Sequence, residues 1–150
     1  MCTIRKATNT DIDAIKKIYE WAFCGMEGLI QEHFKFEKYV EFFLRHKFAY
    51  VAVEEDVVCG VLFAYEVPDL MFGEILYIEL LAVLPEYQKK GIGTKLLNQV
   101  RVDANNAGFQ EITLRTACYL DAYEIYKKYG FKDTKTDRRY MSLMLQKKIK

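Results

Sequence analysis

Residues Ile75–Thr94 read ILYIELLAVLPEYQKKGIGT, and the interpretation of the rest of the chain starts from them. The first half, from Ile75 to Leu84, is apolar on both of the faces that alternate along a β-strand. A strand of this kind belongs in the middle of a sheet whose two faces are both covered. Glu79 interrupts the apolar run, and Pro85 ends the strand because proline cannot extend the hydrogen-bond ladder.

The second half is a glycine-rich turn, Gln88–Gly93, followed by an amphipathic helix that ends near Gly108. The helix has one apolar stripe, formed by Ile92, Leu96, Leu97, Val100 and Ala104. A helix start exposes unpaired backbone N–H groups and a partial positive charge, and glycines there let phosphate oxygens approach closely. Lys89 and Lys90 add positive charge. A strand, a basic glycine-rich turn and a helix in this order indicate a phosphate-binding arrangement.

The spacing of the turn matches neither the P-loop pattern nor the Gly-x-Gly-x-x-Gly pattern of dinucleotide-binding proteins. It resembles the acetyl-CoA signature of the GCN5-related N-acetyltransferase (GNAT) family, [Gln/Arg]-x-x-Gly-x-[Gly/Ala], in the residues Gln88-Lys89-Lys90-Gly91-Ile92-Gly93. Six residues alone are a weak signal, but the preceding strand and the following helix strengthen it. The alternative is an ordinary helix start after a tight turn.

A second resemblance to the GNAT family lies near the end of the chain. The element Tyr-x-x-x-Gly-Phe of that family corresponds to residues 126–131, and Ala122 lies four residues before Tyr126, as in the family. One position departs from the pattern, because Tyr119 stands where the family often has an asparagine that contacts the cofactor. With both motifs in the usual order, the resemblance covers nearly the full length.

Hydrophobic periodicity and turn residues predict the element order β-α-α-β-β-β-α-β-α-β-β. The expected fold class is α/β (α+β), a single-domain GNAT fold over residues 1–150, with a central mixed, twisted sheet flanked by helices on both faces. The strands are expected at residues 2–6, 48–54, 57–67, 75–84, 111–115, from 131 onward and at 139–146. Helices are expected from residues 12, 36, 92 and 120.

Composition narrows the classes of function. A chain of 150 residues with 51% hydrophobic residues predicts one packed domain, and its net charge of +1 gives no basic field for nucleic acid or an anionic membrane. No apolar run reaches the roughly 18 residues that a membrane span needs, and the N-terminus has no apolar signal core. We therefore expect a cytoplasmic protein without nucleic-acid or membrane partners.

The four cysteines and two histidines do not form a metal-binding pattern. We expect free thiols in a reducing compartment and no metal cofactor. The oligomeric state stays open, with a homodimer as one option, because exposed aromatic residues could pair between copies.

The GNAT resemblance implies how acetyl-CoA is held. It points to a bulged middle of the central strand near Leu81–Val83, where an unpaired N–H stabilises the oxyanion and the backbone pairs with the pantetheine arm. The neighbouring strand, residues 112–115, is expected to splay away. The residues expected to contact acetyl-CoA are Leu81, Ala82, Val83, Gln88, Lys89, Lys90, Gly91, Ile92, Gly93, Thr94 and Tyr126.

Two side chains are candidates for the catalytic roles. Glu79, which shares a strand face with Leu81 and Val83 by the two-residue period, would act as base directly, act through water, or hold the ammonium group. Its alternative role is a structural salt bridge or a solvated carboxylate. Tyr126 matches the family position of the general acid that protonates the leaving thiolate, and its alternative role is a core aromatic.

The leading function is an acetyl-CoA-dependent N-acetyltransferase acting on a primary amine of a small metabolite, an amino acid or peptide, or a protein lysine. The alternative is a non-catalytic acyl-CoA-binding or interaction module on a GNAT scaffold. The GNAT resemblance implies that the amine acceptor lies between the first helices and the end of the third strand, where aromatic and acidic residues suit a cationic amine. The alternative is that these residues form an ordinary core edge and a solvated loop. These residues are Trp21, Phe23, Glu27, Glu32, His33, Phe34, Tyr65, Glu66 and Asp69.

Overall fold

The structure is a computed structural model of the chain, and it describes residues 1–22, 36–70, 73–116, 119–134 and 143. The chain divides into two compact units, Met1–Arg115 and Thr116–Lys150, whose positions relative to one another are not determined. Each unit is therefore described by itself. The first contains a five-stranded sheet, and the second contains helix α4, Asp121–Tyr129.

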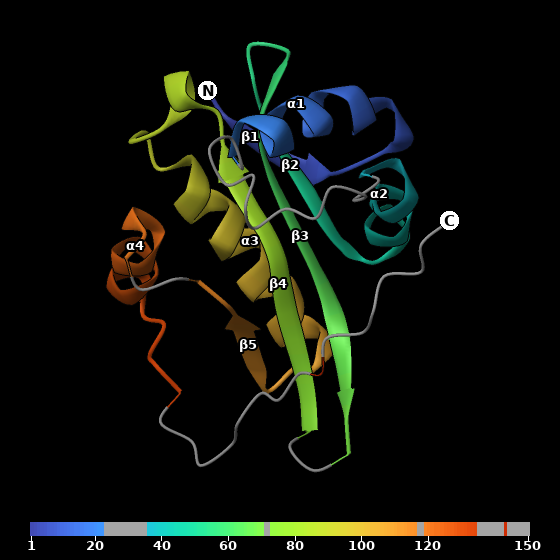
Figure 1. Cartoon of the computed structure of the whole chain (residues 1–150), viewed down its shortest axis with the longest axis vertical. Helices are drawn as coiled ribbons and strands as arrows, with labels where there is room; N and C mark the ends of the chain where they lie inside the picture. The colour runs from blue at the N-terminus through green and yellow to red at the C-terminus, as the bar shows by residue number, and fades with distance from the viewer. Residues whose placement is uncertain (23–35, 71–72, 117–118, 135–142, 144–150) are drawn as a thin grey trace. The chain divides into compact units, whose positions relative to one another are not determined.

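The sheet of the first unit follows the chain order β1-β2-β3-β4-β5 (Figure 1). Its strands are β1 (Thr3–Lys6), β2 (Phe48–Glu54), β3 (Val57–Asp69), β4 (Gly73–Val83) and β5 (Glu111–Leu114). Neighbouring strands from β1 to β4 run antiparallel, and β5 pairs with β4 in parallel. The sheet is mixed, as predicted, and β4 lies between two partners because its residues are apolar on both faces.

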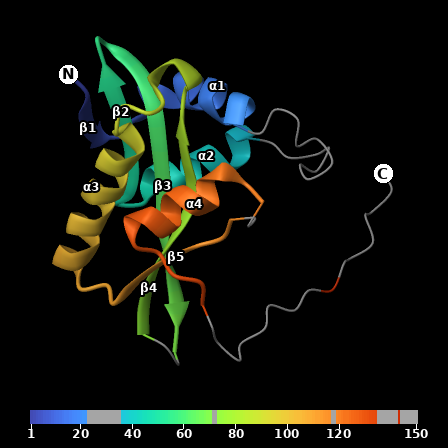
Figure 2. The same cartoon turned by 90° about the vertical axis from the view of Figure 1, so that its left-hand side faces the viewer.

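Helices cover both faces of this sheet (Figure 2). On one face, α1 (Ile12–Ala22) and α2 (Phe36–Arg45) pack against alternate strand residues in a buried cluster. The strand members of that cluster are Ala49, Val51, Val61, Phe63, Leu80 and Ala82. On the other face lies α3 (Ile92–Ala107), whose stripe of Ile92, Leu96, Leu97, Val100 and Ala104 is buried as predicted. Each fully buried leucine contributes about 1.5–3 kcal/mol of apolar burial.

The hairpin between β2 and β3 turns at Glu55 and Asp56, as the sequence predicts. Both residues have positive φ, 50° and 63°, which is the backbone geometry of a tight two-residue hairpin turn. One expectation at the other end of β3 is wrong. Pro68 does not begin a loop, because the pairing continues through Pro68 opposite Glu74 and ends with Asp69 opposite Gly73.

The second unit confirms the helix expected before Gly130, which caps α4 with a φ of 123°. The strand expected from residue 131 onward is absent from residues 131–134, which have no regular secondary structure. The last expected strand, 139–146, lies outside the described residues except for position 143.

An ion pair between exposed Arg5 and buried Asp11 positions α1 on the sheet. The guanidinium of Arg5 in β1 donates two hydrogen bonds of 2.8 Å to the carboxylate of Asp11, which is 4% exposed. The same carboxylate accepts the backbone N–H of Thr8 at 2.8 Å, so it closes the turn that leads into α1. The hydrogen bond from Arg5 is the largest cause that lowers the pKa of Asp11.

We predict that Asp11→Asn lowers the free energy of unfolding by about 2 kcal/mol at pH 7, because it removes a bidentate hydrogen-bonded charge pair. The folded-state pKa lies below the unfolded value of about 3.9, so this contribution is present above pH 4 and is lost as the pH falls through the folded pKa. Urea unfolding at pH 7 and pH 3 should show the gap to the wild type narrowing at pH 3. Asp13→Asn, an exposed change in the same helix, is the control, and an equal loss at both pH values would contradict the prediction.

Candidate active site

A β-bulge at Glu79 sets the geometry of the central strand. Phe63 pairs with Leu80 and Ala64 pairs with Ile78, so Glu79 is the extra residue of β4. The sequence predicted a bulge nearer Leu81–Val83, and its position is therefore corrected. The predicted shared face is also wrong, because the extra residue breaks the two-residue alternation. After the bulge, Leu80 turns into the cluster under α1 and α2.

Leu81 and Val83 point their backbone N–H groups away from β3. The N–H of Leu84 donates to the carbonyl of Cys59 at 2.8 Å, which makes Val83 and Gly60 a non-hydrogen-bonded pair. By alternation, the N–H of Leu81 has the same orientation as that of Val83, whereas the N–H of Ala82 between them faces β3. On the opposite side of β4, pairing with β5 stops at Ile78, so within the described residues of the first unit this stretch has an open edge (Figure 1). Because β5 itself ends at Leu114, the expected splay stays a prediction.

The turn after β4 is anchored to this open edge. The side-chain amide of Gln88 donates to the carbonyl of Val83 at 2.9 Å. After it, Lys89 has a φ of 61° and Gly91 a φ of 81°, so two residues of the turn are left-handed. Such a turn points successive N–H groups in one direction and forms a concave anion-binding surface.

The N-terminus of α3 has the properties of an anion site. Gly91 is the N-cap, no side chain caps the helix, and the first turn contains no acidic residue. The first intrahelical bond runs from the N–H of Lys95 to the carbonyl of Gly91 at 3.0 Å. The N–H groups of residues 92–94 thus have no partner within the helix. A Cβ built on Gly93 would meet nothing within 4 Å, so the space beside this residue in the first turn of the helix is open.

Exposed cations surround this helix start. Lys89 and Lys90 are exposed, and the ammonium of Lys90 lies 5.4 Å from the centre of the Tyr87 ring. Thr94 is exposed as well, whereas Ile92 is buried and contributes only its backbone. Local positive charge, a helix dipole and open backbone donors all favour a phosphate or pyrophosphate group.

The carboxylate of Glu79 is exposed on the sheet face that carries α1 and α2. Two tyrosines are its electrostatic neighbours, Tyr19 of α1 and Tyr65 of β3. Burial is the larger cause that raises the pKa of each phenol, and the negative charge of Glu79 raises each pKa further. The structure thus places a carboxylate beside two phenols that stay neutral. Sequence analysis missed Tyr19, because it fitted the apolar stripe of a helix.

The ring of Tyr65 belongs to an aromatic cluster. Its centre lies 5.5 Å from that of Tyr77, 5.9 Å from that of Phe42 and 6.0 Å from that of Phe43. The Tyr77 hydroxyl in turn accepts a hydrogen bond of 3.0 Å from Nε of Arg115. Of the other expected acceptor residues, Trp21 is exposed on α1, and Phe23, Glu27, Glu32, His33 and Phe34 lie outside the described residues.

Tyr126 lies in the second unit, on α4. Its ring contacts Phe131 edge to face at a centroid distance of 5.6 Å, and its carbonyl accepts the N–H groups of Gly130 and Phe131. Burial raises the pKa of its phenol to about 12. The family element at residues 126–131 thus forms a helix end on which Phe131 folds back. Tyr119, in place of the family asparagine, is 75% exposed.

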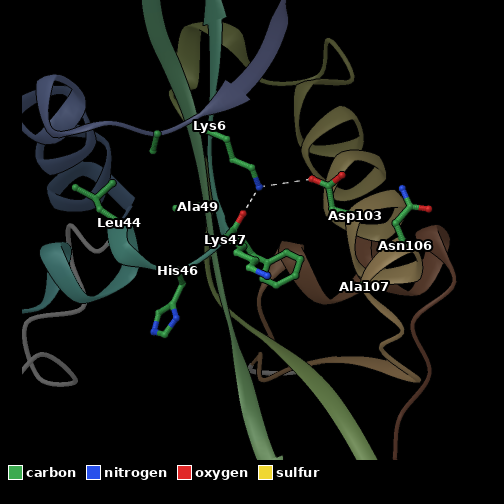
Figure 3. Close-up of a pocket in the computed structure, with 10 residues that line it drawn as sticks. Lys6, Leu44, His46, Lys47, Ala49, Asp103, Asn106 and Ala107 are labelled. Atoms are coloured by element: carbon green, nitrogen blue, oxygen red, sulfur yellow. Dashed lines mark hydrogen bonds and ion pairs between the residues drawn. The ribbon is translucent and has the colours of Figure 1, made fainter.

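A pocket of about 570 Å³ lies elsewhere in the first unit, where β1 ends and β2 begins (Figure 3). Asp103 of α3 lines it and accepts a hydrogen bond of 2.5 Å from the hydroxyl of Tyr50. Lys6 donates to the Tyr50 hydroxyl and to the carbonyl of Lys47, and lies 3.6 Å from Asp103. This network balances the charge of Lys6 within the protein. It joins β1, β2 and α3, and we assign it a structural role.

Comparison with known proteins places the chain. The model of the acetyltransferase (GNAT) family matches residues 15–131. The chain belongs to the acetyltransferase (GNAT) family. An N-alpha-acetyltransferase of Sulfurisphaera tokodaii is 28% identical over 91% of this chain and 84% of its own length. N-alpha-acetyltransferase 30 of Schizosaccharomyces pombe is 35% identical over 70% of this chain and 73% of its own length. The chain is accordingly a GNAT N-acetyltransferase, as predicted.

Solved structures share the GNAT fold. A transcriptional regulator from Bacillus halodurans superposes with a TM-score of 0.79 at 21% identity, over 97% of this chain and 100% of that chain. An aminoglycoside acetyltransferase, AAC(6′)-Iy, in complex with a bisubstrate analogue, gives 0.76 at 18% identity, over 96% and 99%. Among the described residues, no helix is long and apolar enough to cross a membrane.

We predict that alanine at the two glycines of the turn has opposite effects on stability. Gly91→Ala should lower the free energy of unfolding by about 1 kcal/mol, because its left-handed φ disfavours a Cβ. Gly93→Ala should raise it by about 0.5 kcal/mol, because its position is helical and unobstructed. Urea unfolding of both variants beside the wild type tests this. A loss of stability in Gly93→Ala would show that the space beside this residue is not open.

Proposed function

We propose that the protein transfers an acetyl group from acetyl-CoA to the α-amino group of a peptide or amino acid, by direct attack of the amine. The open edge of β4 and the uncapped start of α3 carry this proposal, because one short turn joins them. The first can pair with an extended amide chain and the second can bind a pyrophosphate. Pantetheine and pyrophosphate occur in that order in acetyl-CoA.

Backbone groups of β4 would bind the thioester end. Leu81 and Val83 offer N–H groups to the open edge, so either can donate to the thioester oxygen as negative charge develops on it. The N–H of Ala82 faces β3, so Ala82 offers no donor to the thioester. Gln88, Lys89, Lys90, Gly91, Ile92, Gly93 and Thr94 would surround the pyrophosphate.

The choice of an α-amine rests on protonation and on the relatives. An α-amine has a pKa of about 7.7–8.0, so roughly a third of it is neutral at pH 7.5, whereas a lysine side chain with a pKa of about 10.4 is almost entirely protonated. An α-amine therefore needs less help from a base. The two curated relatives are both named as N-alpha-acetyltransferases, which supports the same class of acceptor.

Glu79 would take the proton that the amine loses, directly or through a water molecule, as its nitrogen bonds to the acetyl carbon. The carbon–sulfur bond then breaks, and the CoA sulfur leaves as a thiolate. Tyr126 would offer its hydroxyl proton to that sulfur. With a pKa of about 12, the phenol stays protonated through neutral and mildly alkaline pH. It is therefore available as a donor over the whole working range.

We predict that acetyl-CoA binds with a dissociation constant on the order of micromolar, and that Gly93→Asp weakens binding by at least about tenfold. The added carboxylate would occupy the open space and repel the pyrophosphate. Isothermal titration calorimetry measures both. Val102→Asp adds the same charge on the exposed side of the same helix and should bind like the wild type. Absence of binding by folded wild type would contradict acetyl-CoA as the donor.

We predict that Glu79→Gln and Tyr126→Phe each lower kcat about 10- to 100-fold, while acetyl-CoA affinity stays within about twofold, because they act on protons rather than on cosubstrate binding. Steady-state acetylation of a peptide with a free N-terminus measures kcat, and calorimetry measures affinity. Glu111→Gln, an exposed change at the start of β5, is the control. An unchanged kcat in either variant would remove that residue from the mechanism.

A further inference from the structure

The surroundings of Glu79 determine which form of the acceptor can bind, provided that the function proposed above holds. We propose that Tyr19 and Tyr65 are specificity-determining residues of the acceptor site. Their side chains flank Glu79 from a helix and from a strand, and bind the reacting amine in its ammonium form. The acceptor class is therefore a primary amine that is positively charged in solution.

The strand register places Tyr65 beside Glu79. Tyr65 lies directly opposite Tyr77 in the ladder, and the two rings are in contact at 5.5 Å. Two residues further along β4 from Tyr77, on the same face, comes Glu79. Because a bulged residue shares the face of the residue that follows it, Glu79 also lies beside Leu80, within the surface under α1 and α2.

Tyr19 reaches the same surface from α1. It is half-buried and packs against the cluster that contains Phe63 and Leu80, and its ring lies 5.3 Å from that of Phe36. The negative charge of Glu79 acts on the phenols of both Tyr19 and Tyr65, so the carboxylate lies within electrostatic range of each.

Both tyrosines are held in place before any acceptor arrives. Phe42, Phe43 and Tyr77 surround the ring of Tyr65, and the helix that carries Tyr19 is fixed by the ion pair of Arg5 with Asp11. Little conformational entropy is therefore lost when a ligand contacts them, which favours affinity.

A carboxylate beside two aromatic side chains is the chemistry that recognises an ammonium group. The carboxylate supplies the opposite charge, and aromatic faces attract cations through their quadrupole. Neutral phenol oxygens add acceptors for ammonium N–H groups. A nearby cation of the protein, Arg115, donates to the Tyr77 hydroxyl and is engaged there. The proton that the ammonium must lose can then pass to the carboxylate of Glu79.

The test compares two peptides of the same sequence, one with an ordinary cationic N-terminus and one with an aminooxyacetyl N-terminus, which is neutral at pH 7.5. For Tyr19→Leu and Tyr65→Leu, we expect KM for the cationic peptide to rise about 5- to 30-fold, with kcat within about twofold. KM for the neutral peptide should change less than about twofold. Tyr65→Phe keeps the ring and should stay within about threefold of the wild type.

Tyr39→Leu is the matched control. Tyr39 is an exposed tyrosine of α2 whose ring already faces the ammonium of Lys38 at 5.4 Å, so its loss should leave both KM values unchanged. Equal increases of KM for the two peptides, or a full loss in Tyr65→Phe, would overturn the proposal. So would an equal effect of Tyr39→Leu.

A second readout separates this inference from the proposed function. Saturation-transfer NMR with tetramethylammonium chloride reports cation binding without any transfer step. Weaker binding in Tyr19→Leu and Tyr65→Leu than in the wild type and Tyr39→Leu supports the cation site even if no peptide is acetylated. In that case the proposed function alone fails. Equal binding to all four proteins overturns the cation site, whatever the acetylation assay shows.

Discussion

The extra residue at position 79 of the central strand is the constraint on which the rest of the site depends. Up to Glu79, β4 follows the alternation that its sequence dictates, and after it every side chain changes face. Leu80 and Ala82, each 8% exposed, therefore fill the core under α1 and α2. The same shift keeps an acidic side chain on that face at a point where no core residue has to be displaced. In a strand without the extra residue, Leu80 and Ala82 would lie on the opposite face of the sheet.

The second consequence concerns the backbone. A sheet edge with unpaired N–H groups is a liability, because it invites another chain to pair. Here pairing with the parallel partner β5 stops at Ile78, and within the described residues of the first unit no strand pairs with β4 on that side from there to Val83. The side-chain amide of Gln88 donates to the carbonyl of Val83 at the end of this stretch. What remains open is a short row of amides that leads toward a helix start, and an extended amide ligand with an anionic end matches it. The proposed cosubstrate would therefore extend the hydrogen-bond pattern of the sheet.

The sequence predicted those parts of the molecule whose signals are local. Alternation and breakers located β2 within its observed bounds, the hairpin at Glu55, the central strand and the stripe of α3, and a short motif located the glycine-rich turn before α3. That this turn binds an anion stays a prediction. The position of the bulge was not predicted correctly, because a bulge leaves no signature in the amino-acid composition. Its position depends on which leucine of the strand packs into the core. The strand was expected to end before Pro68, because the sequence does not show that this proline pairs with Glu74 of the neighbouring strand. The position of Tyr19 near Glu79 was not predicted, because the apolar stripe of a helix has the same spacing whether the residues at its edge contact the core or line a binding site.

Backbone conformation distinguishes the glycine-rich turn before α3 from an ordinary one. Glu55 and Asp56 are also left-handed, but a two-residue hairpin requires that geometry, so their φ values say nothing about a ligand. Lys89 joins no pair of strands, and a non-glycine residue in this region costs about 1 kcal/mol. Gln88 before it is fixed to Val83, and Gly91 after it begins α3. The strain is therefore imposed from both sides, in a segment that a less strained loop could span. Strain of this kind persists where it orients groups for a function, which supports the proposal that the turn and the start of α3 bind a phosphate.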